Sequence, residues 1–123
     1  MKIGIDAIAY YVPQQYLPIE ALAEARNIEY AKLNKGLGLT SMSFPDTDED
    51  AATMGANAVL NLFTDEPLDP STVGRLYLGT ESALDSAKPT ATYILDLVEQ
   101  QLASSHGANC LRNVDAVDMT FAC

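Results

Sequence analysis

Apolar residues recur at two different periods along the chain, and each period predicts one kind of element. At residues 2–12 every second position is apolar, a pattern typical of a strand with one buried face. Two more apolar runs, at 73–80 and from Leu111 onward, predict two further strands. The strand at 73–80 is largely apolar, which is typical of a strand inside a sheet that is covered on both faces. A short run at 39–44 is compatible with another strand, which Pro45 would end.

Helices are expected between these strands. Short helices are predicted at 19–26 and at 29–33, the second ending before the glycines of 36–38. Apolar stripes at helical spacing predict longer helices at 51–63 and 89–102, and the small residues in the first stripe indicate close packing against a neighbouring element. This order of elements predicts a layered α/β fold with a mixed, partly parallel sheet and covering helices.

An acidic run at 46–50 precedes the third expected helix. It lacks the glycine and the distal glutamate of a calcium loop, so we predict no metal site there. Thr47 and Asp50 have the spacing of a capping box, and acidic residues in a first turn interact favourably with the helix dipole. We therefore expect this run to begin a helix.

Composition narrows the class of protein. A chain of 123 residues with 48% hydrophobic and 20% charged residues is large enough to bury a core. Its net charge of −10, with seven Lys and Arg, argues against partners that are nucleic acids or anionic membranes. No signal peptide or spanning helix is visible, and Cys110 and Cys123 do not form a disulfide framework. We expect a soluble cytoplasmic protein.

Two candidates for chemistry stand at the ends of predicted strands. Glu81 follows the strand at 73–80, and Cys123 follows the last strand. In a partly parallel sheet both ends would lie at one edge, where a thiol nucleophile and a carboxyl group can carry out acyl transfer and proton transfer. The backbone N–H of Cys123 would help to hold the thioester oxygen. On spacing alone, a packing cysteine and a solvated glutamate are the commoner interpretations.

The stretch around Glu81 resembles a known family. Residues 79–89, Gly-Thr-Glu-Ser-Ala-Leu-Asp-Ser-Ala-Lys-Pro, look like the segment of 3-hydroxy-3-methylglutaryl-CoA synthase that carries its general acid/base glutamate. Ala122-Cys123 matches the nucleophile of that family. Further similar stretches, in the same order as in the family, are residues 3–6, 11–13, 22–26, 36–38, Asp50 and 54–58.

The resemblance implies a thiolase-type fold and the synthase reaction of the mevalonate pathway. Cys123 would be acetylated by acetyl-CoA, and Glu81 would assist removal of a proton from the acetyl methyl group, which attacks acetoacetyl-CoA. Hydrolysis would then release the product. Glu29 and Tyr30 correspond to positions that touch CoA in the family, although the family more often has other residues there. The resemblance implies that the enzyme uses these two substrates without a cofactor. It also implies that the full-length enzyme is a homodimer.

The resemblance also implies that residues 1–123 are the N-terminal portion of a longer enzyme, an incomplete domain that ends at its nucleophile. The catalytic histidine and asparagine of the family lie beyond that point, and His106 does not correspond to this histidine. The segment at 100–113 contains more residues than the corresponding segment of the family, and we expect the additional residues to enlarge a surface loop. Cys110 is expected to be a small packing residue. The isolated chain is expected to be inactive and to expose apolar surface.

Two other interpretations stay open. One is a related synthase that acts on carrier-protein-bound β-keto chains in polyketide β-branching. The other is a non-catalytic thiolase-like remnant whose role is association. A downstream histidine and asparagine would favour an enzyme, whereas a stop codon directly after Cys123 would favour the remnant.

Overall fold

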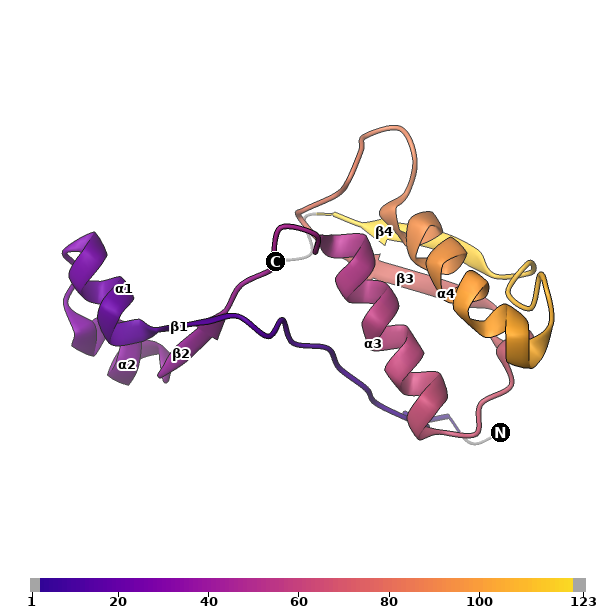
Figure 1. The fold of residues 1–123 in the computed structure, drawn as a ribbon, viewed down its shortest axis with the longest axis horizontal. Coiled ribbons are helices and arrows are strands. Elements are labelled where there is room, and N and C mark those ends of the chain that lie inside the picture. The colour runs from indigo at the N-terminus through magenta and orange to yellow at the C-terminus, as the bar shows by residue number, and fades with distance from the viewer. Residues whose placement is uncertain (1–2, 121–123) are drawn as a thin grey trace. The chain divides into compact units, whose positions relative to one another are not determined.

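The computed structural model describes residues 3–120, and these divide into two compact units. Residues 12–48 form the smaller unit, and the rest of the described chain forms the larger one (Figure 1). Cys123 lies outside the described residues. Among the residues that are described, no helix is both long enough and apolar enough to cross a membrane.

The larger unit is built on two parallel strands. β3 (Arg75–Gly79) pairs with β4 (Asp115–Met119), and the helix α4 (Thr90–His106) connects them. Helix α3 (Ala51–Asp65) packs beside α4, and a 3₁₀ turn (Pro70–Thr72) precedes β3. The prediction of an α/β fold with partly parallel strands is confirmed.

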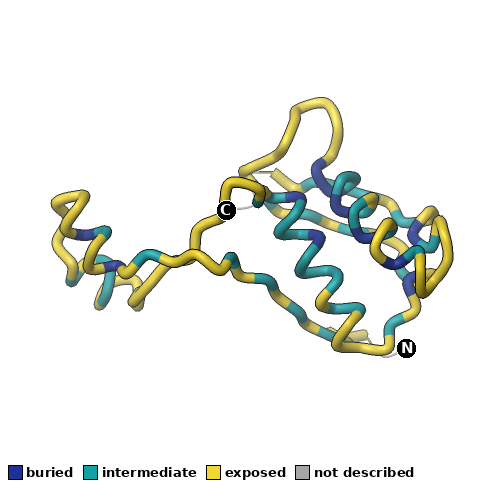
Figure 2. The backbone as a smooth tube through the Cα atoms, viewed as in Figure 1, coloured by how far each residue is buried: buried dark blue, intermediate teal, exposed yellow. Residues whose placement is uncertain are grey.

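The core lies between the two helices and the strands. Its buried members are Ala52, Ala56, Ile94, Val98, Leu102 and Leu111 (Figure 2). Leu76 and Leu78 of β3 are half-buried against this cluster, whereas Arg75 and Tyr77 alternate with them and are exposed. The prediction that this strand is covered on both faces is therefore wrong for residues 3–120, because helices cover only one of its faces.

Helices α3 and α4 approach closely where α3 has a glycine. A Cβ atom at Gly55 would lie 2.5 Å from Cδ1 of Ile94, which is buried. The space that a side chain at residue 55 would need is thus filled by α4. This contact confirms the prediction of close packing from the small residues of the stripe.

The cap of α3 differs from the predicted one. Oδ1 of Asp50 accepts a hydrogen bond from the backbone N–H of Thr53 (2.8 Å), and Oγ1 of Thr53 accepts one from the N–H of Asp50 (2.7 Å). The capping box therefore joins Asp50 to Thr53, and the predicted box of Thr47 with Asp50 is wrong. The backbone N–H of Thr47 donates instead to Asp46 (2.7 Å).

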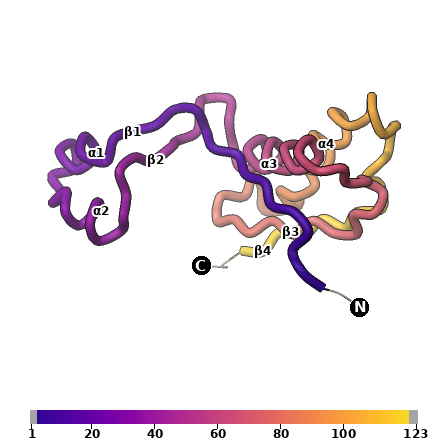
Figure 3. The backbone as a smooth tube through the Cα atoms, turned by 90° about the horizontal axis from the view of Figure 1, so that it is seen from below, coloured from indigo at the N-terminus to yellow at the C-terminus, as the bar shows by residue number. Residues whose placement is uncertain are grey.

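The N-terminal segment is extended but is not a strand (Figure 3). A strand needs a hydrogen-bonded partner, and none of the residues in 3–120 pairs with it. It lies along α3 instead, where Nδ2 of Asn61 donates to the carbonyl of Tyr10 (2.9 Å). Ala7 and Ala9 are half-buried as the period predicts, but Ile3 and Ile5 are 85% and 81% exposed. The predicted strand with one buried face is wrong in this chain.

The smaller unit contains a short antiparallel pair and two short helices. β1 (Tyr16–Pro18) pairs with β2 (Ser41–Ser43), which lies within the strand predicted at 39–44. α1 (Ile19–Arg26) matches its predicted range. α2 (Tyr30–Leu37) is longer than predicted.

Gly38 is the reason why α2 is longer. This residue, and not Gly36, takes the left-handed conformation that ends the helix, with φ of 71°. Gly36 lies inside the last turn, where its backbone stays helical.

The segment between α4 and β4 also differs from its prediction. Helix α4 continues to His106, so residues 104–106 are helical and not part of a loop. Residues 108–113 form turns, and β4 begins only at Asp115. The backbone N–H of Leu111 in these turns donates to Oε1 of Glu99 on α4 (2.8 Å). The predicted surface loop over 100–113 is thus helix in its first half. Cys110 packs against the core, as expected.

Candidate functional site

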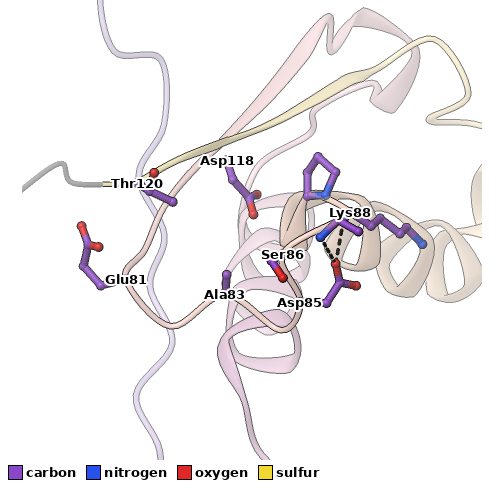
Figure 4. Close-up of a pocket in the computed structure, with 9 residues that line it drawn as sticks. Glu81, Ala83, Asp85, Ser86, Lys88, Asp118 and Thr120 are labelled. Atoms are coloured by element: carbon purple, nitrogen blue, oxygen red, sulfur yellow. Dashed lines mark hydrogen bonds between the residues drawn. The ribbon is translucent and has the colours of Figure 1, made fainter.

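The ends of the two parallel strands border a pocket of about 630 Å³ (Figure 4). Gly79 is the register partner of Met119, and the next N–H, that of Thr80, donates to the carbonyl of Met119 (3.3 Å). Glu81 and Thr120 follow directly and both line the pocket. Ligands bind at the carboxyl ends of strands in open α/β sheets, so this edge is the candidate site.

The strand that leads to the predicted nucleophile therefore ends beside the loop that carries Glu81. Thr120 is the last described residue, and Cys123 follows three positions later in the sequence. The juxtaposition of the strand ends is observed, whereas the pairing of Glu81 with Cys123 and their catalytic roles stay predictions.

Hydrogen bonds within the loop after β3 fix its shape. Oγ1 of Thr80 accepts the N–H of Ser82 (3.0 Å) at the start of the loop. At its end, Oδ1 of Asp85 accepts the N–H groups of Ala87 (2.8 Å) and Lys88 (2.6 Å), a local turn that Asp side chains favour. Glu81 is thus carried by a loop whose two ends are both hydrogen-bonded.

Asp85 also binds the helix that follows. The hydroxyl of Tyr93 donates to its Oδ2 (2.6 Å), and Nζ of Lys88 lies 4.0 Å from the centre of the Tyr93 ring. The hydrogen bond from Tyr93, with those from the backbone of Lys88 and Ala87, lowers the pKa of Asp85 below its ordinary value. The same hydrogen bond raises the pKa of Tyr93. This trio anchors the loop to the first turn of α4.

Replacing Tyr93 with phenylalanine should raise the pKa of Asp85 toward its ordinary value, because the largest cause of its depression is removed. A depressed carboxyl pKa stabilises the folded state above the unfolded pKa, and this stabilisation is lost as the pH falls through the folded pKa. The variant should therefore lose less stability than the parent protein as the pH falls from the ordinary carboxyl pKa through the folded-state pKa of Asp85. NMR titration of the Asp85 carboxyl carbon measures the shift directly.

Tyr77→Phe is the matched control, since the hydroxyl of Tyr77 contacts Arg75 and not Asp85. An Asp85 titration that is the same in Tyr93→Phe and in the parent protein would contradict the assignment.

Asp118 is a residue that the sequence analysis missed. From β4, its Oδ2 accepts the N–H of Thr90 (2.6 Å) and its Oδ1 accepts the N–H of Ala91 (2.8 Å). Pro89 precedes α4 and provides no side-chain cap, so these N–H groups need an acceptor from elsewhere. The available signal was an acidic residue inside the apolar run before Cys123, the second of two in that run after Asp115.

The other predicted residues lie away from this edge or in the smaller unit. His106 ends α4, whose 17 residues place its ends roughly 24 Å apart at 1.5 Å per residue. It is therefore remote from the pocket at the start of that helix, as expected. Glu29 directly precedes α2 in the smaller unit and Tyr30 is its first residue. Both are exposed, and their contact with CoA stays a prediction. Within residues 3–120, no cluster of His, Cys, Asp and Glu could hold a metal ion.

Comparison with known proteins gives a consistent result. The family model described as "Hydroxymethylglutaryl-coenzyme A synthase N terminal" matches residues 1–123. Hydroxymethylglutaryl-CoA synthase of Haloferax volcanii is 37% identical over 99% of the chain and 26% of the relative. MvaS in complex with 3-hydroxy-3-methylglutaryl coenzyme A is 35% identical, with a TM-score of 0.79 over 97% of this chain and 27% of that one.

A more distant structure extends the likeness at the level of fold. β-Ketoacyl-acyl carrier protein synthase III of Thermus thermophilus has a TM-score of 0.72 and 21% identity, over 96% of this chain and 33% of that one. Both structures are thiolase-like condensing enzymes, so the predicted fold class is confirmed. The chain spans about a quarter of the length of the Haloferax volcanii relative.

Proposed function

The chain belongs to the hydroxymethylglutaryl-coenzyme A synthase family, and from this premise we propose that the protein condenses acetyl-CoA with acetoacetyl-CoA. The observation that carries the proposal is the pocket at the ends of β3 and β4. At this pocket the Glu81 loop lies beside the end of β4, the strand that precedes Cys123 in the sequence. A thiol and a carboxyl group at one edge are what the reaction requires.

The proposed reaction has three steps. The Cys123 thiol gives up its proton, and the thiolate attacks the carbonyl carbon of acetyl-CoA. The bond from that carbon to the CoA sulfur breaks and the CoA thiolate takes up the released proton, so that an acetyl thioester forms on the enzyme. Glu81 then assists removal of a proton from the acetyl methyl group, whose carbon bonds to the ketone carbon of acetoacetyl-CoA, and the ketone oxygen becomes a hydroxyl group. Water finally cleaves the enzyme thioester, which frees the Cys123 thiol and leaves a carboxylate on the product.

Binding of the substrates is proposed from the same relatives. MvaS was solved with 3-hydroxy-3-methylglutaryl coenzyme A, which supports a CoA thioester as the ligand. Glu29 and Tyr30 are the proposed contacts with CoA. Both substrates are activated as thioesters, so the proposed reaction uses no further cofactor. A homodimer and a cytoplasmic location stay predictions.

The proposal is tested with the full-length protein. Acetyl-CoA and acetoacetyl-CoA are supplied together, and formation of 3-hydroxy-3-methylglutaryl-CoA is followed by mass spectrometry. We expect product only when both thioesters are present. A parallel reaction with acetoacetyl groups on an acyl carrier protein tests the polyketide alternative. Turnover of the carrier-bound substrate alone would overturn the choice of free CoA, and turnover of neither would favour the non-catalytic remnant.

A further inference from the structure

The loop that carries Glu81 is tied at both ends to consecutive residues of β4. At its start, the N–H of Thr80 donates to the carbonyl of Met119 (3.3 Å). At its end, the carboxylate of Asp118 accepts the N–H groups of Thr90 and Ala91 at 2.6 and 2.8 Å. The position of this loop is therefore set relative to β4, the strand that precedes Cys123 in the sequence.

A buried hydroxyl carries the second tie into the loop itself. Thr90 is fully buried, and its Oγ1 accepts the N–H of Leu84 (3.1 Å), three residues after Glu81. Asp118 thus holds Thr90, and Thr90 holds the middle of the loop. Figure 4 shows Asp118 on the strand, between the Glu81 side of the loop and the start of α4.

The charge of Asp118 suits this position. A carboxylate at a helix N-terminus interacts favourably with the helix dipole and accepts N–H groups that have no partner inside the helix. Hydrogen bonds to an ionised acceptor are shorter and stronger than those to a neutral one. Because Pro89 offers no side-chain cap, Asp118 is the group that holds the first turn of α4 in place.

We propose that Asp118 is a positioning residue, which sets the place of the Glu81 carboxyl group relative to Cys123 by holding the first turn of α4 and, through Thr90, the loop. This inference rests on the proposed function. It assigns Asp118 no contact with the reacting atoms. It predicts that Asp118 matters for the step that uses Glu81, carbon–carbon bond formation, more than for acetylation of the thiol.

The test compares Asp118→Asn with Asp96→Asn in the full-length protein. Asparagine keeps the shape of the side chain but presents an NH₂ group where one backbone N–H needs an acceptor. Asp96 lies on α4 as well and is exposed, with its carboxylate accepting from Gln100 (2.9 Å), so it controls for the loss of one charge. We expect Asp118→Asn to lower the kcat of condensation by about 10-fold to 100-fold, as misplacement of a reacting group does. The rate of acetylation by labelled acetyl-CoA should change little.

A double variant separates positioning from a general loss of structure. If Asp118 acts through Glu81, adding Asp118→Asn to Glu81→Gln should cause little further loss of kcat. A purely structural role would lower kcat by the same factor in both backgrounds.

Thr90 provides a second pair of variants in case Asp118→Asn does not fold. Thr90→Val keeps the shape but removes the hydroxyl that Leu84 binds, whereas Thr90→Ser keeps the hydroxyl and removes a methyl group. We expect the valine variant to lose condensation activity and the serine variant to retain most of it.

The outcomes distinguish the two claims. A parent protein without condensation activity would overturn the proposed function. An active parent protein whose Asp118→Asn variant keeps its kcat, or loses acetylation and condensation equally, would overturn the positioning role alone. A Thr90→Val variant with more condensation activity than Thr90→Ser would also overturn the positioning role.

Discussion

Replacing Cys123 with alanine is expected to abolish covalent labelling by acetyl-CoA and to lower turnover of the full-length protein by roughly 10⁶-fold, the loss typical of removing a nucleophile. No acyl-enzyme can form without the thiol, and a nearby carboxyl group is a poor substitute. The measurement is mass spectrometry of the intact protein after incubation with acetyl-CoA, together with the rate of CoA release.

Cys110→Ala is the matched control for this prediction. Cys110 packs against the core of the larger unit, so its removal leaves the proposed nucleophile in place. The control should still gain one acetyl group. An acetyl group on the Cys123→Ala variant would show that another residue is the nucleophile.

Replacing Glu81 with glutamine is expected to lower the kcat of condensation by about 10²-fold to 10⁴-fold, the range for loss of a general acid or base. Glutamine has nearly the same shape as glutamate but cannot take the proton from the acetyl methyl group. Acetylation of Cys123 should survive, because it precedes the step that needs this carboxyl group. Stopped-flow and steady-state assays of the two half-reactions separate these effects.

The control for Glu81 is Glu66→Gln, which removes an exposed carboxyl group at the C-terminal end of α3, outside the pocket. It should leave both half-reactions unchanged. Equal losses of acetylation and condensation in Glu81→Gln would argue against a role specific to proton transfer.

Local patterns predicted α3 and α4 of the larger unit and the place of Glu81 after β3. The stripe at 51–63 became α3, and Pro89 immediately precedes α4, because amphipathic spacing and helix boundaries are local properties. The ends of β3 and β4 could be placed at one edge because a helix between two strands favours a parallel pair.

Features that depend on distant partners could not be predicted in this way. The alternation at residues 2–12 is real, since Ala7 and Ala9 are half-buried, but a strand also needs a neighbouring strand. The choice between Gly36 and Gly38 as the end of α2 depends on which of them takes positive φ. The role of Asp118 depends on a contact with Thr90, which lies 28 positions earlier in the chain.

The close approach of Gly55 to Ile94 has a consequence for changes of chain length. A side chain at residue 55 would collide with Cδ1 of Ile94, so sliding of α4 along α3 would bring other atoms into the same narrow gap. Turns added to or removed from α4 beyond Leu102 should therefore displace its outer end and leave the turn at Thr90 where it is. Insertions and deletions around the exposed residues 104–109, before Cys110 and Leu111 join the core, should be tolerated better than any of comparable size between Thr90 and Ile94.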